Sequence, residues 1–131
     1  MTLRRLLLVF VGGTIGTAAR LAMGLAMPDA GGLPVATLMV NVLGSLLIGV
    51  LAARLPATSE RRLLLGTGVL GGFTTYSAFM TGTVALWGEA PVLAVVYAGG
   101  SLILGLTAAA AGLRLGRPRP RPATSPAGGE S

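Results

Sequence analysis

Four long apolar stretches, separated by short polar breaks, restrict the possible folds of this chain more than any other feature. The hydrocarbon core of a bilayer is about 30 Å thick, and a helix needs roughly 20 apolar residues to cross it. Stretches of this kind cover about residues 6–27, 33–55, 62–87 and 91–115. Since unpaired backbone groups are costly in hydrocarbon, each stretch should be helical. We therefore predict an all-α membrane protein with four transmembrane helices.

The breaks between the stretches contain turn-forming residues. Residues 28–32 read Pro-Asp-Ala-Gly-Gly, residues 56–60 read Pro-Ala-Thr-Ser-Glu, and Pro91 is placed to start the last helix. One transmembrane domain is expected over residues 1–115. Residues 116–131 are dominated by proline, arginine, glycine and serine, so we expect a disordered cytoplasmic tail.

Composition excludes several classes of function. Only 11% of the residues are charged, against about 25% in soluble domains, so we do not expect a soluble enzyme. The chain has no cysteine and no histidine, which removes disulfides, thiolate nucleophiles, zinc sites and imidazole acid–base chemistry. The net charge of +6 comes from arginines at the ends of apolar stretches. Because these arginines form no basic face interleaved with aromatics, nucleic acid is not an expected partner.

The arginines predict the orientation of the chain in the cell membrane. With four crossings, both termini and the loop between the second and third helices lie on the same side. That side carries nine arginines: Arg4, Arg5, Arg54, Arg61, Arg62, Arg114, Arg117, Arg119 and Arg121. The loops on the opposite side carry only Asp29 and Glu89. The positive-inside rule then places both termini in the cytoplasm.

The third stretch contains residues that are poor material for a continuous helix. Gly71 and Gly72 are followed by Phe73, and residues 74–77 read Thr-Thr-Tyr-Ser. This pattern predicts a break near mid-membrane, where freed carbonyls could hold an alkali cation. A glycine-rich packing face, with hydroxyls bonded to carbonyls one turn earlier, is an equally good interpretation of the pattern.

Polar residues recur at helical spacing in two other stretches. Four residues follow one face of the second stretch, and three follow one face of the fourth: Thr37, Asn41, Ser45 and Gly49, then Tyr97, Ser101 and Gly105. Such stripes are typical of interhelical hydrogen bonding, and together with a broken helix they also suggest a polar path. Gly12 and Gly16 have the spacing of a helix contact.

Charged residues inside the stretches are nearly absent. Arg20 is the exception, and it is either a functional group or a side chain that extends to the interface. No carboxylate lies inside a stretch, whereas a proton-coupled exporter of organic cations needs one. A path lined by amides, hydroxyls and aromatic edges suits an anion better.

Three segments resemble the signatures of the CrcB/Fluc family of fluoride channels. Residues 12–20 read Gly-Gly-Thr-Ile-Gly-Thr-Ala-Ala-Arg, residues 37–41 read Thr-Leu-Met-Val-Asn, and residues 71–79 read Gly-Gly-Phe-Thr-Thr-Tyr-Ser-Ala-Phe. The resemblance extends over about residues 5–113. It implies a passive channel through which fluoride leaves the cytoplasm, which limits fluoride toxicity. It also implies an antiparallel (inverted) dimer in membrane lipid, with two pores and a central structural sodium ion.

The resemblance also implies roles for individual residues. The backbone carbonyls of Gly71 and Thr74 would hold the sodium ion, and Arg20 corresponds to the arginine of the family's first helix. The implied fluoride path consists of Asn41, Thr37, Thr75, Tyr76, Phe79, Tyr97 and Ser101. Tyr76 stands where the family usually has phenylalanine, and Gly82 stands where glutamate is common. We further expect the break to need the conformational freedom of Gly71.

The strong charge bias has a consequence for assembly. An antiparallel pair needs one subunit in each orientation, whereas this chain is biased toward one. We therefore expect a heterodimer with a related chain of opposite charge bias. The alternatives are a homodimer that includes a minority of inverted copies, a partner subunit whose own pore does not conduct, and a small drug or metabolite exporter.

Overall fold

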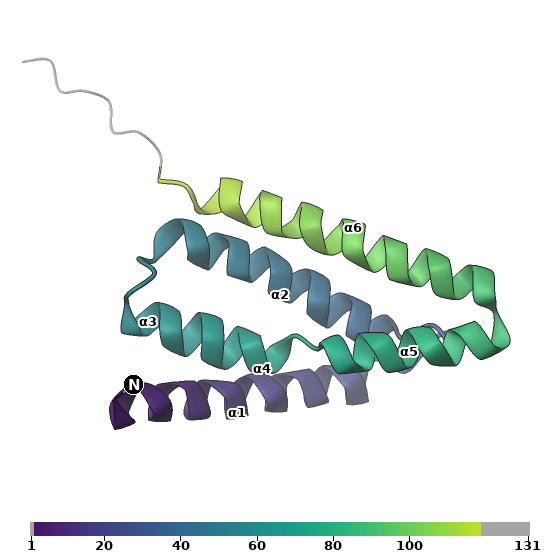
Figure 1. Ribbon diagram of the computed structural model, residues 1–131, viewed down its shortest axis with the longest axis horizontal. Coiled ribbons are helices and arrows are strands. Elements are labelled where there is room, and N and C mark those ends of the chain that lie inside the picture. The colour runs from purple at the N-terminus through teal and green to yellow at the C-terminus, as the bar shows by residue number, and fades with distance from the viewer. Residues whose placement is uncertain (1, 119–131) are drawn as a thin grey trace, which may run out of the picture.

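The computed structural model describes residues 2–118, in which helices are joined by short connections and there is one isolated β-bridge, between Ala30 and Leu33 (Figure 1). Four helical segments are long and apolar enough to cross a membrane: Leu3–Ala26, Val35–Arg54, Glu60–Glu89 and Pro91–Gly116. The prediction of an all-α chain with four such segments is confirmed. Most of the expected tail, residues 119–131, lies outside the described residues.

The first, second and fourth segments are single helices, whereas the third segment consists of four pieces. The single helices are α1 (Leu3–Ala26), α2 (Val35–Arg54) and α6 (Pro91–Gly116). The third segment contains α3 (Glu60–Arg62), the π-helical stretch η1 (Leu63–Leu70), α4 (Gly71–Phe73) and α5 (Tyr76–Glu89).

Local sequence explains where several elements begin. The hydroxyl of Ser59 accepts a hydrogen bond from the backbone N–H of Arg62 at 3.2 Å and so caps α3. Pro91 stands in the first turn of α6, where its missing N–H costs nothing. Gly31 and Gly32 have φ of 59° and 80° in the two-residue turn between α1 and α2. Because side chains disfavour this left-handed region, the turn needs both glycines.

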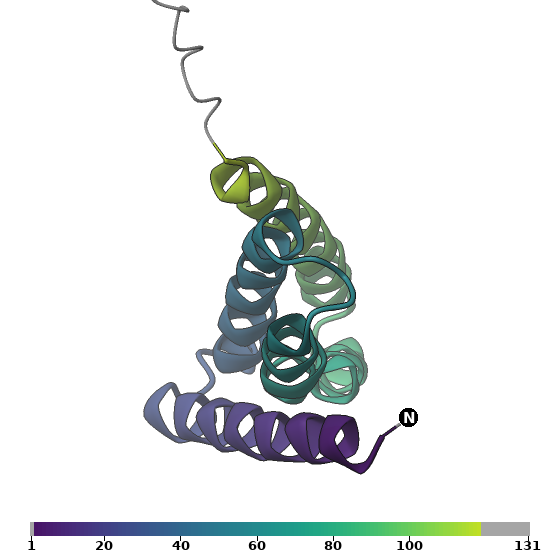
Figure 2. The same cartoon turned by 90° about the vertical axis from the view of Figure 1, so that its left-hand side faces the viewer.

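The helices pack as two close pairs. α1 lies along η1 and α4, and α2 lies along α6, while α5 also contacts α6 (Figure 2). Gly12 and Gly16 of α1 are buried against the third segment. A Cβ on Gly12 would come within 2.9 Å of the Cα of Gly68, so the backbones touch. The expectation that Gly12 and Gly16 form a helix contact is confirmed.

A second glycine contact joins α2 to α6. A Cβ on Gly49 would come within 2.9 Å of the backbone nitrogen of Leu113, and a Cβ on Gly112 would come within 3.0 Å of that of Val50. Close backbone approach of this kind is typical of helices that associate inside a membrane.

Most large apolar side chains face outward. The buried apolar core comprises six residues: Val40, Leu70, Phe73, Leu86, Ala94 and Tyr97. Leu25, Val92, Phe10 and Leu106, in contrast, are each at least 70% exposed. An apolar surface of this extent is expected where lipid or another subunit covers the protein.

The two ends of the bundle differ in charge. The N-terminus, the α2–α3 connection and the end of α6 lie at one end (Figure 1). Arg4 forms an ion pair with Glu60 there at 2.6 Å, and the Arg54 side chain donates to the carbonyl of Gly116 at 3.4 Å. All described arginines except Arg20 belong to the elements at this end.

Candidate functional site

The third segment is interrupted at Thr74 and Thr75. Thr74 has φ −72° and ψ 152°, and Thr75 has φ −143° and ψ 120°, so both residues are extended. Helix α4 ends before them and α5 begins after them at Tyr76. The hydroxyl of Thr75 accepts from the backbone N–H of Ala78 at 3.2 Å and caps α5.

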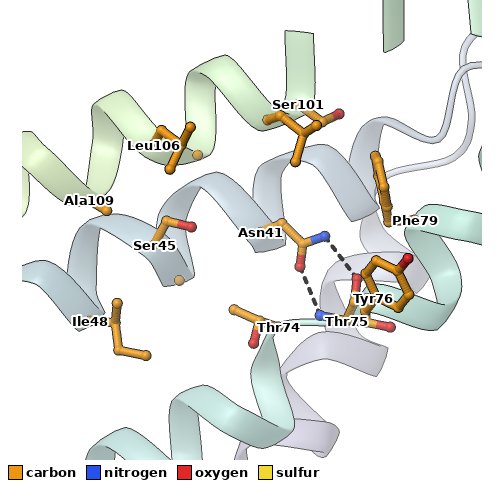
Figure 3. Close-up of a pocket in the computed structure, with 13 residues that line it drawn as sticks. Asn41, Ser45, Ile48, Thr74, Thr75, Tyr76, Phe79, Ser101, Leu106 and Ala109 are labelled. Carbon is orange, nitrogen blue, oxygen red and sulfur yellow. Dashed lines mark hydrogen bonds between the residues drawn. The ribbon is translucent and has the colours of Figure 1, made fainter. Parts of the chain in front are cut away.

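The side chain of Asn41 on α2 pairs with the backbone of Thr75 (Figure 3). The Thr75 N–H donates to Asn41 Oδ1 at 2.8 Å, and Asn41 Nδ2 donates to the Thr75 carbonyl at 2.9 Å. Thr75 is only 8% exposed, so its backbone groups need such partners. Asn41 thus performs the interhelical role that polar residues commonly have in membrane helices, while one of its two amide hydrogens is left over.

At the interruption, two donors that a continuous helix would use are diverted to side chains. In such a helix the N–H of Thr75 would bond the carbonyl of Gly71, and the N–H of Ala78 would bond that of Thr74. Instead the first N–H donates to Asn41 and the second to the Thr75 hydroxyl. The carbonyls of Gly71 and Thr74 are therefore released from their helical donors.

Arg20 on α1 donates a hydrogen bond to another carbonyl at the interruption, that of Gly72. Its Nε donates to the carbonyl of Gly72 at 3.2 Å, and the Thr17 hydroxyl also reaches this oxygen at 3.4 Å. A cation at the C-terminal end of a helix is favourable because the last carbonyls carry partial negative charge. The side chain of Arg20 is thus engaged with the third segment.

A cavity of about 420 Å³ lies between α2, α6 and the interruption. It is lined by Asn41, Gly44, Ser45, Ile48, Thr74, Thr75, Tyr76, Phe79, Ser101, Leu102, Gly105, Leu106 and Ala109. Figure 3 shows the polar side chains near Thr75 and the apolar ones farther along α2 and α6. The cavity therefore has one polar end and one apolar end.

Three aromatic rings form a row beside the polar end. The ring centroids of Tyr76 and Phe79 are 6.1 Å apart, and those of Phe79 and Tyr97 are 5.7 Å apart. Tyr76 is 75% exposed, whereas Tyr97 is buried. Within residues 2–118, the hydroxyl oxygens of Tyr97 and Ser101 are buried without a hydrogen-bond partner. Since buried hydroxyls normally have partners, these two neighbouring hydroxyls are candidates for a contact with a ligand.

The structure brings six of the predicted site residues to the cavity wall: Asn41, Thr74, Thr75, Tyr76, Phe79 and Ser101. Tyr97 is next to the wall through its contact with Phe79. Thr37, Gly71 and Arg20 are not among the lining residues. Several lining residues were not among the site residues implied by the family resemblance, and of these Ser45 and Gly105 belong to the polar stripes identified from helical spacing.

The expected reason for a glycine at position 71 is wrong. Gly71 has φ −65° and ψ −35°, which is ordinary helical backbone, and a Cβ there would meet only the Gly66 carbonyl at 3.7 Å. Its neighbour Gly72 is the constrained residue, because a Cβ would come within 3.0 Å of the Cα of Gly13. Position 72 therefore needs glycine because it packs closely against Gly13, and not because its backbone needs special freedom.

Gly82 is also constrained by a neighbour. A Cβ on Gly82 would come within 2.6 Å of the ring of Pro34, which is buried at the start of α2. A longer side chain at position 82, such as glutamate, would have to displace this proline.

A cation at this site would be bound by neutral oxygen atoms. Within the described residues, no group of three or more histidine, cysteine, aspartate or glutamate side chains could hold a metal ion. The carbonyl oxygens at the interruption are the candidate ligands for such a cation.

Comparison with known proteins gives a consistent result. The profile of the family described as "CrcB-like protein, Camphor Resistance (CrcB)" matches residues 7–113, which include every residue of the cavity wall. A protein of Novosphingobium aromaticivorans named "Fluoride-specific ion channel FluC" is 46% identical over 118 residues, covering 83% of this chain and 93% of the relative. One of Thermus thermophilus with the same name is 44% identical over 122 residues, covering 88% and 96%. "Fluoride-specific ion channel FluC 2" of Leifsonia xyli is 44% identical over 121 residues, covering 86% and 83%.

Proposed function

Because the chain belongs to the CrcB-like family, we propose that this multi-pass membrane protein is a subunit of a fluoride-specific ion channel that lets fluoride leave the cytoplasm passively. The observation that carries the proposal is the similarity to relatives with that name, at 44–46% identity over more than four fifths of both chains.

The chemistry of the cavity supports an anion as the transported species. Fluoride is small and strongly hydrated, so it enters a narrow path only where donors replace its water. The free amide hydrogen of Asn41 and the unpartnered hydroxyls of Tyr97 and Ser101 are such donors. The edges of Tyr76 and Phe79 carry partial positive charge and can face an anion. We place the fluoride path along these residues, together with Thr37 and Thr75.

The test is anion efflux from liposomes that hold the purified protein, with its partner subunit if one is required. We expect rapid fluoride efflux and no chloride efflux above that of empty liposomes. Equal rates for the two anions would contradict fluoride specificity, and absence of fluoride efflux would contradict the channel function.

We also propose a structural sodium ion held by the backbone carbonyls of Gly71 and Thr74. These are the two carbonyls whose helical donors are diverted to Asn41 and to the Thr75 hydroxyl, so they fit a hard cation that prefers oxygen. When bound, the ion would supply positive charge inside the protein. Because only the Thr74 backbone would bind it, Thr74→Ser should keep the sodium dependence of dimer stability. Loss of that dependence in this variant would count against the site.

The inverted dimer completes this proposal. An isolated subunit leaves Tyr76 exposed at the mouth of the cavity and exposes much apolar surface, as expected if a second subunit covers this region. We propose that both termini are cytoplasmic and that the second subunit is a related chain of opposite orientation. The arginines gathered at one end of the bundle support a single orientation for this chain.

A further inference from the structure

We propose a second anion-contact position, formed by the hydroxyl of Ser45 on α2 opposite Gly105 on α6. It lies one helical turn from Asn41, on the side toward the arginine-rich end of α2. The inference rests on the proposed fluoride channel function and adds a residue to its path.

Ser45 occupies the middle of the cavity wall. It is half-buried and lines the same cavity as Asn41 and Ser101 (Figure 3). A Cβ on Gly105 would sit 3.5 Å from the Ser45 hydroxyl oxygen and would meet no other atom within 4 Å. The opposite wall at this level is therefore bare backbone with room beside it, and Ser45 supplies the polar side chain.

The Ser45 hydroxyl differs from the hydroxyls of several threonines on the helices. Thr14, Thr81 and Thr107 donate back to carbonyls three or four residues earlier in their own helices. Within residues 2–118, the side-chain hydrogen bonds of α2 are made by Asn41 and Arg54, and none of them involves Ser45. Its O–H is therefore free to donate into the cavity.

The position of Ser45 along α2 places this donor between the apolar end of the cavity and Asn41. The wall beyond it, toward Arg54, is formed by Ile48, Leu106 and Ala109, which offer no side-chain donor. An anion coming from that end reaches Ser45 about 6 Å before Asn41, since a helix rises about 1.5 Å per residue. Without the hydroxyl, the anion would cross this distance with fewer groups to replace its water.

A packing role for Ser45 is the competing explanation, because small residues join α2 to α6 at Gly49 and Gly112. Alanine is as small as serine but cannot donate a hydrogen bond. The substitution Ser45→Ala therefore separates the two explanations. A packing role predicts no change in flux, and an anion contact predicts a slower flux.

The experiment measures fluoride efflux from proteoliposomes that contain wild-type protein, Ser45→Ala, or Ser45→Ala combined with Gly105→Ser. We expect Ser45→Ala to be about threefold to tenfold slower, as for the loss of one hydrogen bond. The double variant should recover most of the rate, because the new hydroxyl faces the same space from α6. Thr107→Val is the control, since the Thr107 hydroxyl is bonded to its own helix and lies outside the cavity.

Each of the following outcomes supports or overturns the proposed anion contact at Ser45. A wild-type rate for Ser45→Ala would overturn the inference and leave the channel function intact, whereas wild-type protein without fluoride efflux would overturn both. If Ser45→Ala does not assemble, Ser45→Cys keeps the size and offers a weaker donor. A reduced rate for Ser45→Cys supports the contact, and a wild-type rate overturns it.

Discussion

Asn41 links α2 to the interruption of the third segment through one side chain. Its carboxamide forms two hydrogen bonds to the backbone of Thr75, with the oxygen accepting and the nitrogen donating. The same side chain has a second amide hydrogen that can reach an anion in the cavity. We therefore propose that Asn41 has a functional role in addition to the structural one.

The substitution Asn41→Asp tests both roles. The new carboxylate still accepts from the Thr75 N–H, but its second oxygen faces the Thr75 carbonyl in place of a donor. It also adds a negative charge, which would repel an anion 4 Å away by about 4 kcal/mol at an effective dielectric of about 20. We expect fluoride efflux to fall to the level of empty liposomes.

The measurement is efflux by a fluoride electrode, with size-exclusion chromatography to show that the variant assembles. A correctly assembled Asn41→Asp protein with normal efflux would mean that Asn41 serves packing alone.

At the scale of elements, close glycine contacts hold α1 against the third segment. Gly12 and Gly13 are neighbours on α1 but differ in their surroundings. A Cβ on Gly12 would meet the backbone of Leu64 and Gly68, whereas a Cβ on Gly13 would meet nothing within 4 Å. The pair therefore provides a variant and its matched control at the same depth in the helix.

We expect Gly12→Ala to destabilise the protein by about 1–3 kcal/mol, because the added methyl group forces the two backbones apart. Gly13→Ala should cause little change. The measurement is the midpoint of thermal unfolding in detergent for both variants. Equal destabilisation by the two substitutions would show that the contact at Gly12 is unimportant.

At the scale of the whole molecule, positive charge is concentrated at one end. Arg4 and Arg5 lie near the start of α1, Arg54 ends α2, and Arg114 lies in the last turn of α6 (Figure 1). The opposite end carries Asp29 in the connection after α1 and Glu89 at the end of α5. An asymmetry of this size favours one orientation during insertion.

The prediction is that the chain inserts with its C-terminus in the cytoplasm and that this gene alone gives little fluoride resistance. A C-terminal tag should be labelled from the cytoplasmic side only in cells that express this gene alone. The double variant Asp29→Arg/Glu89→Arg should place part of the population the other way, because it reduces the bias. Equal labelling on both faces for the unaltered chain, with full resistance, would exclude the heterodimer.

Local sequence was sufficient to predict four membrane-length helical segments and the turns between them, but not the π-helical stretch η1. Length and hydropathy define four segments, because a membrane crossing needs an apolar run of fixed length. Pro91 marks a helix start and Gly31-Gly32 marks a turn, because each of these residue types has a narrow set of favourable backbone angles. These features depend on a residue and its immediate neighbours, which the sequence presents directly.

The details of the site depended on contacts between distant residues. Asn41 and Thr75 are 34 residues apart, and their pairing decides which backbone groups at the interruption are satisfied. The partner of Arg20 is the carbonyl of Gly72, and Gly71 needs no special backbone angle while Gly72 is pressed against Gly13. Helical spacing places a polar residue on a face, but the residue opposite that face is set by how the helices cross.

The sequence therefore determined the helices and the composition of their polar faces. Only the tertiary structure decided which carbonyls were freed and which hydroxyls met in the cavity, because hydrogen bonds depend on distances that packing alone establishes.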